Sequence, residues 1–214
     1  MDEKRGILKN IFALSPGRAG SMSFANACSH LENYTSAHES LVDQIGTARF
    51  AYPENHIEAD NRLTWHLGQL AQKYDPQDVF YAHLTRDPEK IAQSYFKRWS
   101  EINFRAGIMP AFANGIVMRE KDWPLERKLD VCRFYVETVI ANTQEFLKTQ
   151  QHMDVSLEDN GASFANFLDR IGAVGDLDLV KQDWTKPHND HKFSLELDRK
   201  NNPGLIKRVT RRIF

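Results

Sequence analysis

Short apolar runs alternate along the chain with segments whose apolar residues recur at helical spacing. The apolar runs are typical of buried strands, because each is only a few residues long and is bounded by turn-forming residues. The pattern predicts strands at 6–15 (GILKNIFALS), 33–40 (NYTSAHES), 78–87 (DVFYAHLTRD) and 153–159 (MDVSLED).

Helical periodicity predicts helices between and after these strands. The first helix follows the turn after residue 15 and carries Phe24, Cys28 and Leu31 on one face. Asp87 is suited to the N-cap of a helix that Pro88 begins, and Gly172 is suited to a C-terminal cap. The later helices are expected at 59–75, from Pro88 onward, at 124–149 and at 163–172.

Strands that alternate with helices indicate an α/β fold, in which helices cover both faces of a parallel sheet. No repeat or linker divides the chain, so a single domain over 1–214 is predicted, with an irregular insertion at about 100–122. Ligands bind such sheets at the carboxyl ends of the strands. The turns at Gly17–Ser23 and at Arg86 are therefore expected to meet at one site.

Composition excludes several classes of protein. The 214 residues are 41% hydrophobic and 27% charged, with a net charge of −1, which gives no reason to expect nucleic-acid binding or general attraction to membranes. The basic segment RKNNPGLIKRVTRRIF at the C-terminus is expected to be solvated, with binding of a polyanion or a membrane surface as the alternative.

The two cysteines, Cys28 and Cys132, fall far apart within helical patterns. This arrangement predicts buried thiols in a reducing compartment rather than a disulfide framework. No apolar run reaches the length of a membrane span, and the first residues lack a signal cleavage site. A cytoplasmic location is therefore expected, and the sequence does not indicate an oligomeric state.

The turn LSPGRAGSMSF opens a predicted helix, where unpaired backbone N–H groups and the helix dipole favour an anion. Gly17 and Gly20 are only three residues apart, and the Lys-Ser/Thr pair of a Walker loop is absent. Arg18 supplies a fixed cation for a metal-independent transfer. The alternative is a turn in which the glycines only relieve backbone strain.

This turn resembles the 5′-phosphosulfate loop of the sulfotransferases that use 3′-phosphoadenosine 5′-phosphosulfate (PAPS). The matching positions are Arg18, Ala19, Gly20, Ser21 and Met22, with Ser23 just beyond. Met22 departs from the hydroxyl-bearing pattern of the family. HLTRDPEKIAQSYFKRW resembles the family's 3′-phosphate site, with Arg86 and, eight residues later, Ser94. The alternatives are a strand-end salt bridge for Arg86 and an ordinary helix surface for Ser94.

VSLEDN with FANFLDRIG, and the loop KPHNDHK, resemble further parts of the family. The resemblance implies a bacterial-type, P-loop-like three-layer α/β fold and PAPS as sulfuryl donor. Arg18 would contact the bridging oxygen and the sulfuryl group, N–H groups of Gly17–Ser23 would hold the 5′-phosphate, and Arg86 with Ser94 the 3′-phosphate. A C-terminal segment at about 180–214, with Trp184, Lys186 and Lys192 as candidates, would close over the nucleotide. The histidines show no ligand spacing, so no metal is expected.

His38 and Glu39, at the end of the second strand, are the candidates for the catalytic base. Neighbouring strand residues point to opposite faces, so only one of them is expected to face the substrate. Imidazole has the more suitable unperturbed pKa, but related bacterial sulfotransferases often place a Glu there, which favours Glu39. The alternative is an ordinary surface pair.

The acceptor is expected to be a small molecule, a carbohydrate or a lipid. Asp60, Asn61 and Arg62 would touch it or merely cap the next helix. The candidates for an apolar wall are Trp99, Phe104, Met109 and Phe112, and the alternative is that such residues pack under the loop. Two other functions remain open: an ATP-dependent phosphotransferase of the P-loop kinase type, and a non-catalytic nucleotide-binding module.

Overall fold

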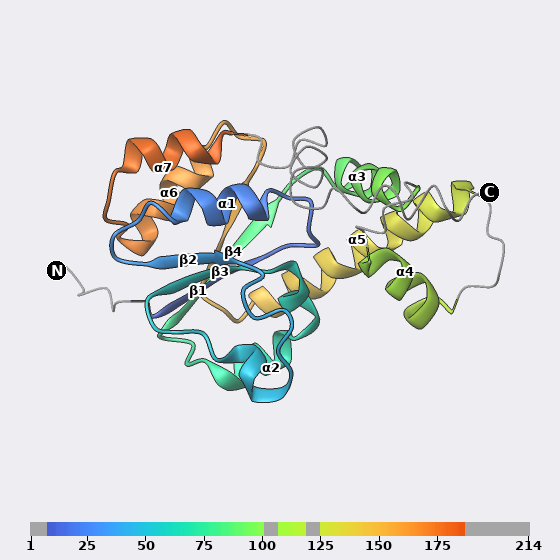
Figure 1. Cartoon of the computed structure of the whole chain (residues 1–214), viewed down its shortest axis with the longest axis horizontal. Helices are drawn as coiled ribbons and strands as arrows, with labels where there is room; N and C mark the ends of the chain where they lie inside the picture. Colours follow the sequence, from blue (N-terminus) through green and yellow to red (C-terminus); the bar gives the residue numbers. More distant parts are fainter. Residues whose placement is uncertain (1–7, 101–106, 119–124, 187–214) are drawn as a thin grey trace, which may run out of the picture.

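Five parallel strands form the central sheet of the computed structural model, which describes residues 8–100, 107–118 and 125–186 (Figure 1). The order across the sheet is β2-β3-β1-β4-β5. All four strand pairs are parallel. The strands are β1 (Asn10–Leu14), β2 (Thr35–His38), β3 (His56–Ala59), β4 (Val79–Thr85) and β5 (His152–Ser156).

Strand alternation divides the core between the two faces of the sheet. Ile11 and Ala13 of β1 join the larger cluster, whereas Phe12 and Leu14 join a second cluster on the other face. Figure 1 shows α1 (Ser21–Cys28), α6 (Ala162–Ile171) and α7 (Leu177–Trp184) over one face and α2 (Leu67–Lys73) against the other. The predicted three-layer α/β class is confirmed.

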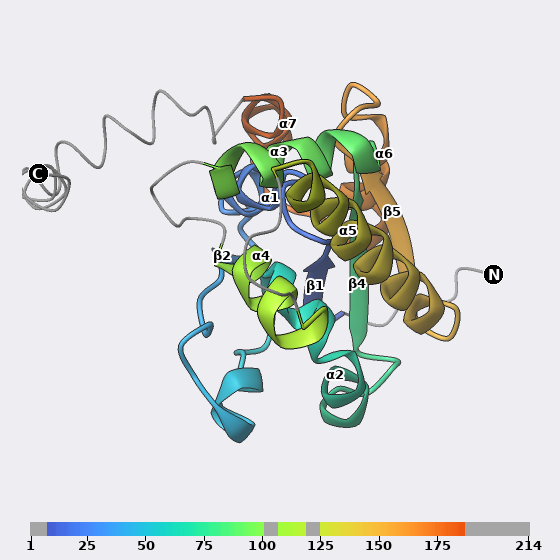
Figure 2. The ribbon, with the colours of Figure 1, turned by 90° about the vertical axis from the view of Figure 1, so that its right-hand side faces the viewer.

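Most of the remaining helical elements contact one another: α5 packs against α3, α4 and η2. Figure 2 shows α5 running alongside α3 and past β4 and β5. Within the described parts of the chain, no helix is both long and apolar enough to cross a membrane. These elements are η1 (Gly46–Phe50), η2 (Asn61–Trp65), α3 (Pro88–Ser100), α4 (Ile108–Ala111), the π-helical η3 (Phe112–Ile116) and α5 (Leu125–Leu147).

Two predicted helix boundaries are confirmed by their cap geometry. Oδ1 of Asp87 accepts from the backbone N–H groups of Glu89 and Lys90, at 2.8 and 3.1 Å, so it caps α3 as expected. Gly172 ends α6 in the left-handed conformation, with φ 63°. Both caps are local features, which is why the sequence reveals them.

The structure differs from the sequence predictions in the segment before α2. The strand β3, with the sequence HIEA, was not predicted, because two of its four residues are ionisable. The predicted helix at 59–75 is divided at His66 into η2 and α2. Pairing between polar side chains, described below, allows this strand to be buried.

Other differences concern the predicted insertion and the chain end. The predicted irregular insertion at 100–122 is described over residues 107–118, most of which are helical in α4 and η3. The helix α7 was not predicted either, although it covers α1. Cys28 and Cys132 are free and buried, as predicted, and burial raises the pKa of both thiols, that of Cys132 to about 12.

Phe24 of α1 is fully buried and joins α1 to the two helices beside it. Its ring centroid lies 5.1 Å from that of Phe167 and 6.2 Å from that of Trp184. Phe24→Ala is expected to lower the free energy of unfolding by about 3–5 kcal/mol, measured by urea denaturation. The matched control is Phe134→Ala, because Phe134 is 53% exposed and its loss is expected to cost less than about 1.5 kcal/mol. Equal losses in the two variants would contradict this description of the core.

Candidate functional site

The candidate site lies where the strand order reverses. After β1 the chain moves towards β2, and after β4 it moves to β5 on the opposite side, so the order reverses between the carboxyl ends of β1 and β4, the position at which open parallel sheets bind ligands. The turn after β1 contains Gly17, Arg18 and Gly20, all in left-handed conformations with φ 86°, 60° and 89°. A left-handed arginine is uncommon, and such strain is found mainly where function or packing requires it.

Two buried tyrosines fix this turn. The hydroxyls of Tyr95 in α3 and Tyr135 in α5 both donate to the carbonyl oxygen of Pro16, at 2.7 and 3.1 Å. Burial raises the pKa of both phenols, so they remain protonated donors. A Cβ atom on Gly17 would lie 2.2 Å from Oη of Tyr95. The turn therefore requires glycine at position 17.

The predicted anion-binding side chains meet at this turn. Nε of Arg18 donates to Oγ of Ser94 over 3.0 Å, and Nη1 of Arg86 donates to the carbonyl oxygen of Arg18 over 2.9 Å. These contacts join residues 76 and 68 positions apart in the sequence. The structure thus brings together three of the residues that the resemblance selected.

The electrostatics of the turn favour an anion. Burial, together with the positive charges of Arg98 and Arg86, lowers the pKa of Arg18 to about 10. This guanidinium is still protonated at neutral pH. None of the ion pairs formed within the described part of the chain involves Arg18 or Arg86. A bound phosphate or sulfate would supply the negative charge that this position lacks.

The other loop residues differ in what they offer. Oγ of Ser21 shares a hydrogen bond of 3.0 Å with Nε2 of His38, and Ser21 begins α1. Oγ of Ser23 donates instead to the carbonyl oxygen of Lys186, over 3.3 Å. Ala19 is fully buried, and Met22 is half-buried. From Ala19 and Met22, only backbone N–H groups are suited to an anion.

The two base candidates lie at the end of β2 but are not separated by strand alternation. The strand ends at His38, and Glu39 is left-handed, with φ 54°, so the rule of opposite faces does not extend to it. Oε1 of Glu39 forms an ion pair with Nη1 of Arg62 at 2.7 Å. Glu39 therefore lies beside the turn after β3, whereas His38 contacts Ser21, which follows the turn after β1.

Several predicted contacts to ligand are not available in the structure. Met109 and Phe112 have exposed fractions of 0% and 2% and belong to the core, so they form no exposed wall. Trp99 is only partly buried against the same core. Trp184 stacks on Phe164 with ring centroids 4.7 Å apart, so it fills the core rather than covering a nucleotide. For Met109 and Phe112 the structure therefore supports the alternative, packing in the core, over contact with a ligand.

Two further candidates lie outside the described residues, and a third is already paired. Phe104 and Lys192 fall in segments that the structure does not describe. Nζ of Lys186 forms an ion pair with Asp183 at 3.1 Å. Asp60 caps η2 by accepting from the N–H of Arg62 at 2.8 Å. Capping was the alternative that the sequence left open for this residue.

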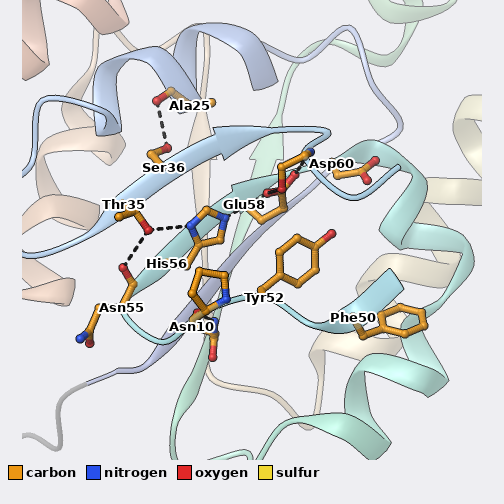
Figure 3. A network of polar contacts seen from close by, with 12 residues as sticks. Asn10, Ala25, Thr35, Ser36, Phe50, Tyr52, Asn55, His56, Glu58 and Asp60 are labelled. Atoms are coloured by element: carbon orange, nitrogen blue, oxygen red, sulfur yellow. Dashed lines mark hydrogen bonds and ion pairs between the residues drawn. The ribbon is translucent and has the colours of Figure 1, made fainter. Parts of the chain in front are cut away.

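Sequence reasoning missed a buried polar network on β3 (Figure 3). Glu58 is fully buried, and its carboxylate accepts from the backbone N–H and the hydroxyl of Ser40, at 2.8 and 2.6 Å, and from Nε2 of His56, at 3.1 Å. Tyr52 stacks on the His56 ring. The spacing of His56, Glu58 and Asp60, two residues apart, was the available signal, because it puts them on one face of a strand.

The charge of Glu58 is stabilised in place. Burial favours the neutral acid, but the hydrogen bonds from His56 and Ser40 outweigh it, and the pKa of Glu58 is lowered. The carboxylate of Asp60 is likewise buried and contacts the buried guanidinium of Arg49. Paired charges of this kind are costly to separate, because the remaining partner would be left buried alone.

A scan against models of protein families, a search of curated proteins and a search of solved structures each found no match. Over the described residues, no group of three or more His, Cys, Asp or Glu side chains is arranged to hold a metal ion. The proposal for function accordingly depends on the geometry of the site and on the motifs of the sequence.

Gly17→Ala is expected to destabilise the protein by more than about 2 kcal/mol, because it adds left-handed strain and a clash with Tyr95. Urea unfolding measures the loss. Gly68→Ala is the matched control: a Cβ there meets nothing within 4 Å, and alanine favours the helix α2. The control is expected to gain about 0.5–1 kcal/mol. A neutral Gly17→Ala would show that the tyrosines do not confine the turn.

Glu58→Gln is expected to flatten the acid side of the stability profile. A lowered native pKa stabilises the fold above the ordinary value of 4.5, and this contribution is lost as the pH falls below it. Urea unfolding between pH 7 and about pH 2 tests this, because the contribution is lost below pH 4.5. The wild type should lose its advantage over the variant as the pH falls. Glu54→Gln, at an exposed position, is the control and should leave the profile unchanged. Parallel profiles for wild type and Glu58→Gln would contradict the lowered pKa.

Proposed function

We propose that the protein transfers a sulfuryl group from PAPS to an acceptor hydroxyl or amine. The observation that supports this best is the contact of Arg18 with Ser94 and of Arg86 with the Arg18 carbonyl. Two motifs that resemble the two phosphate sites of one donor are joined in space, and the guanidinium between them lacks a carboxylate partner among the described residues.

The turn after β1 would hold the 5′-phosphosulfate. Its left-handed residues lead into the N-terminus of α1, where backbone N–H groups and the helix dipole favour the phosphate. In the reaction the S–O bond to the bridging oxygen breaks and its electron pair stays on the 5′-phosphate. Arg18 would stabilise that developing charge, and the hydrogen-bonded His38 and Ser21 would lie beside the transferring group.

Arg86 and Ser94 would hold the 3′-phosphate, the group that distinguishes this donor from ATP. Ser94 Oγ accepts its hydrogen bond from Arg18, so its own O–H proton remains available for a phosphate oxygen. Arg86 keeps further N–H groups beyond the one used on the Arg18 carbonyl. The resemblance adds Lys192 as a further contact to the nucleotide.

Glu39 is the base that the geometry favours. Arg62 engages Oε1 of its carboxylate, which leaves Oε2 for the proton of the acceptor. His38 is hydrogen-bonded to the phosphate turn, so it is placed better for the sulfuryl group than for the acceptor proton. The acceptor oxygen would form the new S–O bond as its proton passes to Glu39, which gives a sulfate ester and 3′-phosphoadenosine 5′-phosphate.

Calorimetric titration tests the donor class. The protein is expected to bind 3′-phosphoadenosine 5′-phosphate and to bind ADP much more weakly. Arg86→Ala should weaken binding of the bisphosphate by about 10- to 100-fold, since it removes charge-assisted hydrogen bonds to phosphate. Arg170→Ala is the matched control. Arg170 lies near the end of α6 and hydrogen-bonds Gln151, which precedes β5, whereas Arg86 follows the carboxyl end of β4, so the control removes an arginine that lies away from the candidate site.

Three results would overturn the proposal. Equal binding of ADP and the bisphosphate would favour a phosphotransferase that uses ATP. Equal losses in Arg86→Ala and Arg170→Ala would show that Arg86 does not read the 3′-phosphate. Binding of the bisphosphate with no release of sulfate or sulfated product from PAPS would favour a non-catalytic nucleotide-binding module.

A further inference from the structure

Two buried carboxylates lie at the end of β3, one within the strand and one directly after it. Glu58 and Asp60 are two residues apart, and both side chains are fully buried. Figure 3 shows Glu58 beside His56 and Tyr52, with Asp60 further along the chain. Burying one carboxylate is costly, and each of these has a dedicated partner: His56 for Glu58 and Arg49 for Asp60. Two buried carboxylates with separate partners are not needed to form a strand, so the backbone groups that they hold indicate a further role for them.

Each carboxylate also holds one backbone N–H at the acceptor side of the site. Oε1 of Glu58 accepts from the N–H of Ser40 over 2.8 Å, and Oδ1 of Asp60 accepts from the N–H of Arg62 over 2.8 Å. Ser40 directly follows Glu39, whose left-handed φ of 54° carries a conformational cost and needs external support. The two bonds therefore fix the backbone at both partners of the Glu39–Arg62 ion pair.

We propose that Glu58 and Asp60 are positioning residues that fix the Glu39–Arg62 ion pair through the backbone N–H groups of Ser40 and Arg62. Its importance for catalysis rests on the proposed function, whereas the holding of the ion pair does not. The carboxylates act through Ser40 and Arg62 and do not touch the substrates. Neither Glu58 nor Asp60 contacts Arg18, Arg86 or Ser94 through a hydrogen bond in the described part of the structure, so they should affect the acceptor step and not donor binding.

The first experiment measures the ion pair itself and needs no catalysis. Rotation of the Arg62 guanidinium about its Nε–Cζ bond, followed by ¹⁵N NMR, should be hindered in the wild type and fast in Glu39→Gln. Glu58→Ala should resemble Glu39→Gln. Ser40→Ala, at an exposed position, removes the hydroxyl bond to Oε2 of Glu58 but keeps the N–H bond to Oε1, so the rotation should be faster than in the wild type and slower than in Glu58→Ala. Ser36→Ala is the matched control: Ser36 donates to the Ala25 carbonyl, outside the network, and should leave the rotation hindered. Hindered rotation retained in both Glu58→Ala and Ser40→Ala would overturn the proposal.

The second experiment measures sulfuryl transfer from PAPS to water, with release of 3′-phosphoadenosine 5′-phosphate. Glu58→Ala should lower kcat by on the order of 100-fold, because small displacements of a catalytic group have effects of that size. The affinity for the bisphosphate should stay within about twofold, because the residues proposed to contact the phosphates are unchanged. Glu58→Gln, which keeps one acceptor oxygen for the Ser40 N–H, should recover part of the loss.

The two experiments separate failure of the proposal from failure of the proposed function. A wild type that neither binds the bisphosphate nor consumes PAPS would overturn the function, while the rotation of Arg62 would still decide the positioning. A Glu58→Ala variant that loses bisphosphate binding and turnover in equal proportion, as its folded fraction falls, would show a structural role only and would overturn the catalytic part of the proposal.

Discussion

The carbonyl oxygen of Pro16 is the point on which the candidate site depends. It receives the hydroxyls of Tyr95 and Tyr135, and these bonds anchor the turn after β1 to α3 and α5. With the turn held there, Gly17 has no room for a side chain, and Arg18 is directed to Ser94, the residue before Tyr95. One acceptor atom thus links the backbone strain of the turn to the placement of its charged side chain.

Buried charges have partners near β3 but, among the described residues, lack a carboxylate partner in the turn after β1. Glu58 accepts hydrogen bonds from His56 and Ser40, Asp60 pairs with Arg49, and both carboxylates support the chain around them. Arg18 is largely buried with further positive charge nearby, which lowers its pKa to about 10. A compensated charge stabilises structure, whereas a charge without a partner favours binding of a ligand that supplies one.

The candidate residues lie at the carboxyl ends of two pairs of strands. The ends of β1 and β4 carry the residues suited to the two phosphates, and the ends of β2 and β3 carry Glu39 and Arg62. Since β3 lies directly beside β1, the ion pair of Glu39 and Arg62 adjoins the turn after β1 in the sheet order.

Local features of the chain were readable from the sequence. The predictions of strands at β1, β2, β4 and β5 were confirmed, Asp87 and Gly172 marked helix ends, and the spacing of glycines and Arg18 marked the turn. Long-range contacts decided the rest. Burial of β3 depends on pairs such as His56 with Glu58. The aromatic residues Phe112 and Trp184 belong to the core because residues distant in the chain pack against them.

Sequence by itself determined the elements and the residues able to bind an anion, because propensity, capping and turn geometry act over a few residues. Only the tertiary structure decided which charges are compensated and which side chains lie at the candidate site, because those depend on partners distant in the chain.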